Sequence, residues 1–203
     1  MNSQVSIALH PSIEQIDRLL ALQRTFAHAC NSLAPLVQQT RTWNRVALHH
    51  LAYRQLREQF PQLGSQMACN VIYSVSRAHR LVLQSPGIPF HVSRWGQRPL
   101  PLLKFADNCP VYFDRHTLSI KQGRASMYTL DGRMRFDVQL PVGTEDAFRH
   151  RKLLELSLRR RAGEGFELSF VFSPEAGVEN MKPADEMNTP SSIPDYLHVQ
   201  AQA

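Results

Sequence analysis

The chain has 203 residues, 43% of them apolar, and a formal net charge of +6, so it can fold around one sizeable core or two small ones. No apolar run approaches the roughly 18 residues that span a bilayer. The first residues, Met1 to Val5, lack the basic start and apolar core of a signal peptide. The sequence therefore predicts a cytoplasmic protein with no membrane partner.

The positive charge is unevenly distributed along the chain. Residues 11–85 hold eight Arg against three acids, residues 86–173 hold fourteen basic against nine acidic side chains, and residues 174–203 hold one Lys against five acids. A basic body favours a polyanionic partner, because Arg and Lys gain affinity by releasing counterions condensed on phosphates. Nearly all the cations are Arg, which forks onto phosphate or stacks on a base. An ordinary solvated basic surface is the alternative.

The first elements are a strand and a helix. Val5 to Leu9 alternate apolar and polar side chains, which predicts a strand that Pro11 ends. Ser12 followed by Gln15 is the pattern of a capping box and predicts that a helix begins there.

Two more helices are expected before residue 86. We predict that Thr42 caps the second helix, that Pro61 ends it, and that Gly64-Ser65 begins the third. The predicted apolar face of the second helix consists of Val46, Tyr53, Leu56 and Phe60. The third helix has one predicted buried stripe, formed by Met67, Val71, Val75, Ala78 and Val82.

From residue 86 onward the apolar pattern changes to a period of two. Strands are predicted at 111–113, 118–120, 126–130, 133–140, 154–158 and 166–172, with Asp131-Gly132 as a hairpin turn. The sequence thus predicts an α+β fold. In it the first strand (1–10) joins the later strands (86–173) in a small β-barrel, the three helices (11–85) are an insertion, and residues 174–203 are a disordered acidic tail.

Neither a metal site nor a cofactor site is expected. His49 and His50 are helix neighbours whose side chains point about 100° apart, and no third ligand stands nearby. The cysteines Cys30, Cys69 and Cys109 are far apart in the sequence and are expected to be reduced and buried. The carboxylates show no convergent set of the kind that a two-metal nuclease needs, so the chain is not expected to be an enzyme by itself.

Arginines beside aromatic or amide side chains are the candidate binding residues, because such groups hold RNA and single strands. The clusters are Arg41, Trp43, Asn44 and Arg45; Tyr53, Arg54 and Arg57; Arg77 and Arg80; Arg149, Arg151 and Lys152; and Arg159, Arg160 and Arg161. In the alternative interpretation, Trp43 and Tyr53 are core residues and the arginines are merely solvated.

Several short motifs occur in an order that is similar to a known family. They are Pro11–Gln15, Ala29–Leu33 with Asn31 ending a helical stretch, Tyr53–Leu63, Ser65–Asn70, Arg77–Arg80, Lys104–Asn108 and Gly163–Phe172. In this order they resemble the N-terminal half of TnpB-type transposon-encoded RNA-guided proteins, which are relatives of type V CRISPR effectors. The resemblance covers about residues 4 to 173.

The resemblance implies a wedge-type, oligonucleotide-binding-like β-barrel with a helical recognition insertion. That half of the family grips a guide RNA and reads a short DNA motif beside the target. Carried over by position, the candidate contacts with the DNA motif are Trp43 or Asn44, Ser65, Gln66, Cys69, Asn70, Ala106 and Asp107. Lys104, which begins the Lys104–Asn108 motif, is a further candidate for binding nucleic acid. The family continues into a RuvC nuclease, whereas here Phe172-Ser173-Pro174 leads into the acidic tail, so we expect that nuclease to be absent.

The expected function is therefore a nuclease-deficient subunit that binds a guide or structured RNA and target DNA. Three alternatives remain open: the binding half of a split nuclease with RuvC on a separate chain, a decayed transposon fragment, and a plain RNA-binding or regulatory protein. We expect strand 166–172 to be an open barrel edge that another subunit or a second copy covers.

Overall fold

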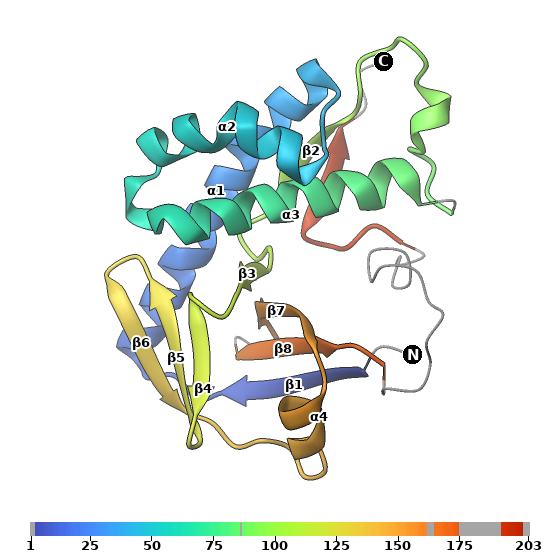
Figure 1. Ribbon diagram of the computed structural model, residues 1–203. Coiled ribbons are helices and arrows are strands. Elements are labelled where there is room, and N and C mark those ends of the chain that lie inside the picture. The colour runs from blue at the N-terminus through green and yellow to red at the C-terminus, as the bar shows by residue number, and fades with distance from the viewer. Residues whose placement is uncertain (1–2, 86, 162–164, 175–191, 201–203) are drawn as a thin grey trace. The chain divides into compact units, whose positions relative to one another are not determined.

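A computed structural model describes residues 3–85, 87–161, 165–174 and 192–200 (Figure 1). These residues form an α+β protein whose strands all pair antiparallel. They fall into two compact units. The described residues within Met1–Leu22 and Pro110–Asn188 are called the sheet unit, and those within Gln23–Cys109 and Thr189–Ala203 are called the helical unit.

A four-stranded sheet forms the core of the sheet unit, in the order β1-β8-β7-β3. Its strands are β1 (Ser3–Leu9), β3 (Val111–Phe113), β7 (Leu153–Arg160) and β8 (Phe166–Phe172). The predicted pairing of the first strand with a late strand is confirmed, since Ser3 lies opposite Phe172 and Leu9 opposite Phe166. The prediction that 166–172 is an open edge is wrong, because β8 pairs with β1 on one side and β7 on the other.

The second sheet of this unit is a meander of β4 (Leu118–Lys121), β5 (Arg124–Thr129) and β6 (Gly132–Asp137). The predicted hairpin is confirmed, but its turn is Leu130-Asp131, one position earlier than predicted. Gly132 is the first residue of β6 and has a φ of 109°, a conformation that favours glycine. Strand β6 ends at Asp137, three residues earlier than predicted. The short helix α4 (Glu145–His150) was not predicted.

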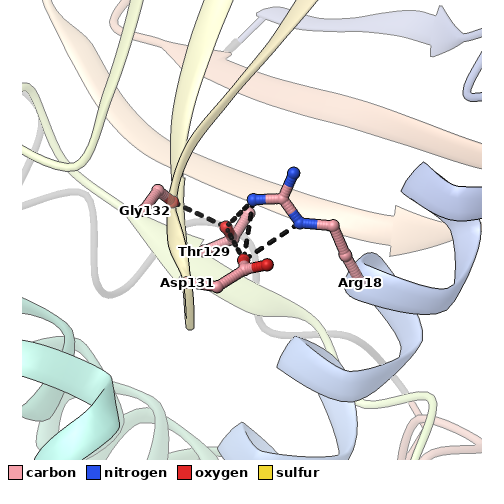
Figure 2. Close-up of polar contacts among 4 residues, drawn as sticks. All are labelled: Arg18, Thr129, Asp131 and Gly132. Carbon is pink, nitrogen blue, oxygen red and sulfur yellow. Dashed lines mark hydrogen bonds and ion pairs between the residues drawn. The ribbon is translucent and has the colours of Figure 1, made fainter.

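The start of α1 (Ile13–Thr40) is fastened to the β5–β6 turn by Arg18 (Figure 2). Arg18 donates from Nε and Nη2 to one oxygen of Asp131, at 2.9 and 2.7 Å, and from Nη2 to the Thr129 hydroxyl at 3.1 Å. The hydrogen bonds from Arg18 are the largest cause that lowers the pKa of the Asp131 carboxyl, and a hydrogen bond from the Thr129 hydroxyl to the same carboxyl is the next largest. The predicted capping box is also present, with Ser12 and Gln15 bonded reciprocally at 3.0 and 3.3 Å.

The helical unit contains residues 23–40 of α1, then α2 (Arg45–Gln59) and α3 (Gly64–Gln84), with single 3-10 turns at Pro61–Leu63 and Val92–Arg94. The predicted stripe of α3 is confirmed, because all five of its side chains are buried. The prediction for α2 is wrong in two respects. Its N-cap is Asn44, which accepts from the backbone N–H groups of Val46 and Ala47 at 3.0 and 3.2 Å, and Val46 is 66% exposed. The side chains that α2 buries are Leu48, Ala52 and Leu56.

Helix α1 does not end at Asn31, as predicted, but continues through Pro35 to Thr40. The Asn31 amide pairs with the backbone of Phe105 like a neighbouring strand: its Nδ2 donates to the Phe105 carbonyl at 2.9 Å, and its Oδ1 accepts from the Phe105 N–H at 2.7 Å. Packing of the helix outweighs the cost of an internal proline here. Two of the motifs named above, around Asn31 and Phe105, are therefore in direct contact.

Phe105 belongs to β2 (Leu102–Phe105), which pairs with β9 (Leu197–Gln200). The register places Phe105 opposite Leu197, and both side chains are buried. The prediction of a wholly disordered tail is therefore wrong for residues 192–200. Residues 175–191 and 201–203 of the predicted tail lie outside the described residues.

Candidate nucleic-acid interface

The net positive charge of the protein belongs mainly to the helical unit. Gln23–Cys109 contains ten Arg and Lys but two acids, Glu58 and Asp107. The segments 1–22 and 110–188 contain thirteen cations and fourteen acids. A polyanion is therefore attracted chiefly by the helical unit.

Helix α3 leaves one narrow row of side chains partly or fully exposed along its length. After Ser65, every residue of this helix is buried except those at positions i, i+3, i+7, i+11, i+14 and i+18, which follow the helical period. This α3 row consists of Gln66, Cys69, Tyr73, Arg77, Arg80 and Gln84. It carries two arginines, one aromatic ring and two amides, and it has no carboxylate.

A second row runs along α2, which lies beside α3 in Figure 1. This α2 row, spaced at four residues, consists of Arg45, His49, Tyr53 and Arg57. The rings of His49 and Tyr53 are stacked, with centroids 4.7 Å apart and planes 20° from parallel. The Arg45 guanidinium lies 5.2 Å from the centroid of the Tyr73 ring, so a cation–π contact joins the α2 row to the α3 row. The two rows together are called the α2–α3 face.

A cavity of about 500 Å³ lies where α1 leads into α2, beside the end of α3. It is lined by Arg41, Thr42, Trp43, Asn44, Arg80 and Gln84. Arg80 and Gln84 also belong to the α3 row, so the cavity and the α2–α3 face are continuous.

Hydrogen bonds hold the four residues that lead from α1 into α2. Arg41 has a φ of 54°, in the left-handed region, and donates from Nη1 to the Arg98 carbonyl at 2.7 Å. The Thr42 hydroxyl donates to the Thr40 carbonyl at 3.2 Å, and the Trp43 carbonyl accepts from the Ser76 hydroxyl at 2.7 Å. Asn44 caps α2. The cavity wall is thus fixed to both neighbouring helices.

Most of the predicted helical-unit residues lie together. Arg41, Trp43, Asn44 and Arg80 line the cavity, and Arg45, Tyr53, Arg57, Gln66, Cys69 and Arg77 belong to the α2–α3 face. Trp43 and Tyr53 are half-buried, so neither is purely a core residue nor fully solvated.

The other predicted residues of this unit lie elsewhere. Arg54 is off the α2 row, with its side chain 94% exposed and paired with Glu58 at 3.1 Å. Asn70 is a correction: it is 5% exposed, on the buried side of α3, with Nδ2 3.7 Å from the Met67 sulfur. The side chains of three more are exposed outside the rows, namely Ser65, Lys104 and Asp107.

The predicted residues of the sheet unit have acids or hydroxyls beside them. Arg159 lies 3.6 Å from a Glu155 oxygen and donates to the Ser157 hydroxyl at 3.1 Å, and Arg161 lies 3.9 Å from Glu167. Arg151 donates to the Ser3 hydroxyl at 3.1 Å. Arg161 is exposed in spite of this contact. Three other members of these clusters are also exposed, namely Arg149, Lys152 and Arg160. The structure places them on α4, on β7 and between these two elements.

Three members of the α2–α3 face are not among the predicted binding residues, namely His49, Tyr73 and Gln84. For His49 and His50, the sequence favours a structural or RNA-facing role over a metal site, without naming either as a contact. Tyr73 stands seven residues after Gln66, so the helical spacing that predicted the buried stripe of α3 also contains the signal for its exposed row.

Histidine and cysteine side chains are buried beneath the face. The His79 Nδ1 bonds to the Val75 carbonyl at 2.8 Å, and burial lowers the pKa of this imidazole to about 4, so it stays neutral near pH 7. Burial is also the main cause that raises the pKa of the Cys30 thiol, and a hydrogen bond with Cys109 adds to it. The three cysteines are free, with Cys30 and Cys109 buried and Cys69 half-buried.

No group of three or more His, Cys, Asp or Glu side chains is placed to hold a metal ion within the described parts of the chain. The rings of His49 and His50 meet edge to face at 6.0 Å. In the same described parts of the chain, no helix is both long and apolar enough to cross a bilayer.

Two comparisons of the sequence, with protein families and with curated proteins, give no match.

Proposed function

We propose that this chain is a nucleic-acid-binding protein that holds a structured RNA on its α2–α3 face. The observation that carries the proposal is the pairing of two side-chain rows on neighbouring helices, joined by the contact of Arg45 with Tyr73. The rows combine guanidinium groups with rings and amides, and they lie in a segment with ten cations and two acids.

Each residue type in the face has a role in such binding. Arg77 and Arg80 on α3, with Arg45 and Arg57 on α2, supply guanidinium groups that bind phosphate oxygens in a bidentate manner. The stacked rings of His49 and Tyr53 present the flat surfaces on which unpaired bases stack. Gln66 can donate to and accept from a base edge or a 2′-hydroxyl.

The order of motifs extends the proposal to a guide RNA with target DNA, as in the N-terminal half of TnpB-type proteins. For the sheet unit this means a wedge-type barrel. Two observations support it: β1 pairs with β8, and a turn of four residues leads from β3 in one sheet directly to β4 in the next. Asp114 holds that turn by accepting from the N–H groups of His116 and Thr117 at 3.0 and 3.1 Å.

The test is a binding titration of the purified full chain with a fluorescent RNA hairpin over a range of salt concentrations. Because binding releases counterions, we expect the logarithm of the association constant to fall linearly with the logarithm of salt concentration. Arg45→Gln should weaken binding and reduce that slope by about one. Arg54→Gln is the matched control on the same helix, off the α2 row and paired with Glu58, and should leave the slope nearly unchanged.

Binding that does not change between low and moderate salt would contradict the proposal, and so would equal losses for the two variants. Sequencing of the RNA that copurifies with the protein then tests the extension to a guide. A single recurring RNA species supports a guide, whereas a random sample of cellular RNA contradicts it.

A further inference from the structure

We propose that the cavity lined by Trp43 holds one unpaired nucleotide, so that the protein prefers RNA with an unstacked base over a continuous duplex. The inference rests on the proposed function, since it assigns a particular part of the nucleic acid to one end of the α2–α3 face. It is carried by the cavity, the chemistry of its lining and the rigidity of its wall.

The lining contains the groups that one nucleotide needs. Trp43 provides an indole surface for stacking, and Arg41 and Arg80 provide guanidinium groups for phosphate. Asn44 and Gln84 provide amides for the edge of a base. The volume of about 500 Å³ is within the range of pockets that hold small organic ligands.

The amides have distinguishable roles. Oδ1 of Asn44 accepts from two N–H groups at the start of α2, so the NH2 half of this side chain is the donor available for a ligand. Gln84, exposed at the end of α3, can turn either a donor or an acceptor toward a base. Together they can recognise a base edge that Watson–Crick pairing would otherwise occupy.

The wall of the cavity is preorganised for a ligand. Arg41 keeps a left-handed φ of 54°, which a residue with a Cβ rarely adopts, while its guanidinium bonds to the Arg98 carbonyl at 2.7 Å. The Trp43 carbonyl is bonded to Ser76 on α3 at 2.7 Å. A fixed backbone lowers the entropy cost of ordering the indole around a base.

A concave site with a ring in its wall selects against a continuous duplex. Inside a duplex both faces of each base are stacked, so a base reaches Trp43 only after it leaves the stack, at a cost that is smallest in single strands, loops and bulges. Because Arg80 belongs to both the cavity and the α3 row, the phosphates next to that base can continue onto the α2–α3 face. A nucleotide within a chain should therefore bind more tightly than a free one.

The chain has two tryptophans, Trp43 and Trp95, which makes a direct test available. In the full-length Trp95→Phe variant, Trp43 is the remaining indole, and a base stacked on it quenches its fluorescence. The probes are a single-stranded RNA of about 12 nucleotides, a blunt RNA duplex of the same length, the same duplex with one bulged nucleotide, and adenosine monophosphate.

We expect the single strand and the bulged duplex to quench Trp43, and the blunt duplex to bind without quenching it. Adenosine monophosphate should quench only at much higher concentration. In the matched Trp43→Phe variant, Trp95 fluorescence should stay constant. Trp43→Leu should lower affinity for the single strand about tenfold, corresponding to one lost base stack, and affinity for the blunt duplex less than twofold.

The outcomes separate this inference from the proposed function. If the wild-type protein binds none of the four probes at moderate salt, both fail. If it binds the single strand with the expected salt slope while Trp43 fluorescence stays constant, the cavity inference fails and the proposed function stands. Equal quenching by the blunt and bulged duplexes also overturns the inference, as does free adenosine monophosphate binding as tightly as the single strand.

Discussion

The helical unit and the sheet unit carry comparable numbers of cations and differ in what lies beside them. Among the described residues of the sheet unit, arginines pair with acids, as Arg18 does with Asp131, Arg124 with Asp137, Arg159 with Glu155, and Arg161 with Glu167. In Gln23–Cys109, ten cations share two acids, and aromatic rings and amides line the rows that hold them. We therefore expect the local ratio of cations to acids, rather than the number of arginines, to mark a surface that binds a polyanion.

The largest expected effect tests this difference directly. The triple variant Arg45→Glu, Arg77→Glu, Arg80→Glu should weaken binding of a structured RNA about a thousandfold at moderate salt, because three phosphate-binding groups become repulsive. The sheet-unit triple Arg115→Glu, Arg124→Glu, Arg135→Glu should cost less than about tenfold. Both are measured by anisotropy with circular dichroism as the folding control.

A third variant tests the sheet-unit clusters predicted from the sequence. The triple variant Arg149→Glu, Lys152→Glu, Arg160→Glu reverses the charge of three exposed members of these clusters. If this variant weakens RNA binding as much as the helical-unit triple variant does, the expectation that the helical unit supplies most of the binding is wrong. An effect near that of the sheet-unit triple supports it.

The second prediction concerns stability. Leu197→Ala should lower the free energy of unfolding by about 3 kcal/mol, because Leu197 is 3% exposed opposite Phe105 and its loss leaves a cavity. Val142→Ala is the control, since Val142 is fully exposed in the sheet unit, and it should change stability by less than about 0.5 kcal/mol. Denaturant unfolding measures both, and equal effects would show that β9 does not stabilise the helical unit.

The third prediction is a difference in acid sensitivity. The pKa of His79 in the folded protein, about 4, is below its unfolded value of 6.5, so the unfolded state binds the proton more tightly and stability falls as pH drops below 6.5. Between pH 8 and pH 5 the loss should be about 2 kcal/mol. His79→Leu should abolish this pH dependence in denaturant titrations, and an unchanged slope would contradict the assignment.

The acid response of Asp131 in the sheet unit falls in a different pH window. Its folded pKa is lowered from 3.8, so its contribution is present above 3.8 and is lost as pH falls through the lower folded value. The helical unit should therefore lose stability first on acidification. Nuclear magnetic resonance of the two units during a pH titration distinguishes this order from a simultaneous loss.

The smallest expected effect is that of the ion pair in Figure 2. Asp131 is largely exposed, with 61% of its side chain accessible, so solvent screens the pair. A double-mutant cycle with Arg18→Gln and Asp131→Asn should give a coupling of less than about 1 kcal/mol. A coupling of several kcal/mol would contradict the prediction that solvent screens this contact.

The parts of the fold that the sequence predicted are those with a strong local period. The α3 stripe and the β5–β6 hairpin depend on neighbours within a few turns or across one tight turn, so their patterns are visible directly. In contrast, β2 and β9 each have four residues and pair across almost half of the chain, which leaves no local signal. The motif around Asn31 predicted the end of a helical stretch, but α1 continues through Pro35 to Thr40.

The candidate site was predictable in composition and less so in arrangement. Taking Val46 as buried set the wrong rotation for α2, so that Arg54 could not be told from Arg45, although one lies off the α2 row and the other is in contact with Tyr73. Asn70 was selected by position in a motif, yet it stands three residues after Met67, on the side of α3 that packs into the core. The cavity depends on the left-handed turn at Arg41, which no residue preference indicated.

The strand pairings also constrain how the chain can fold during synthesis. Strand β1 can pair only after β8 has been synthesised, because Ser3 lies opposite Phe172. Likewise β2 can pair only after β9 has been synthesised, because Leu102 lies opposite Gln200. A domain that emerges from the ribosome from its N-terminus meets these partners late, so both units keep unpaired strand edges for most of translation. Long sequence separation between contacting residues also slows folding. The helical unit is therefore expected to form its helices early and to complete its core only when residues 197–200 have left the ribosome.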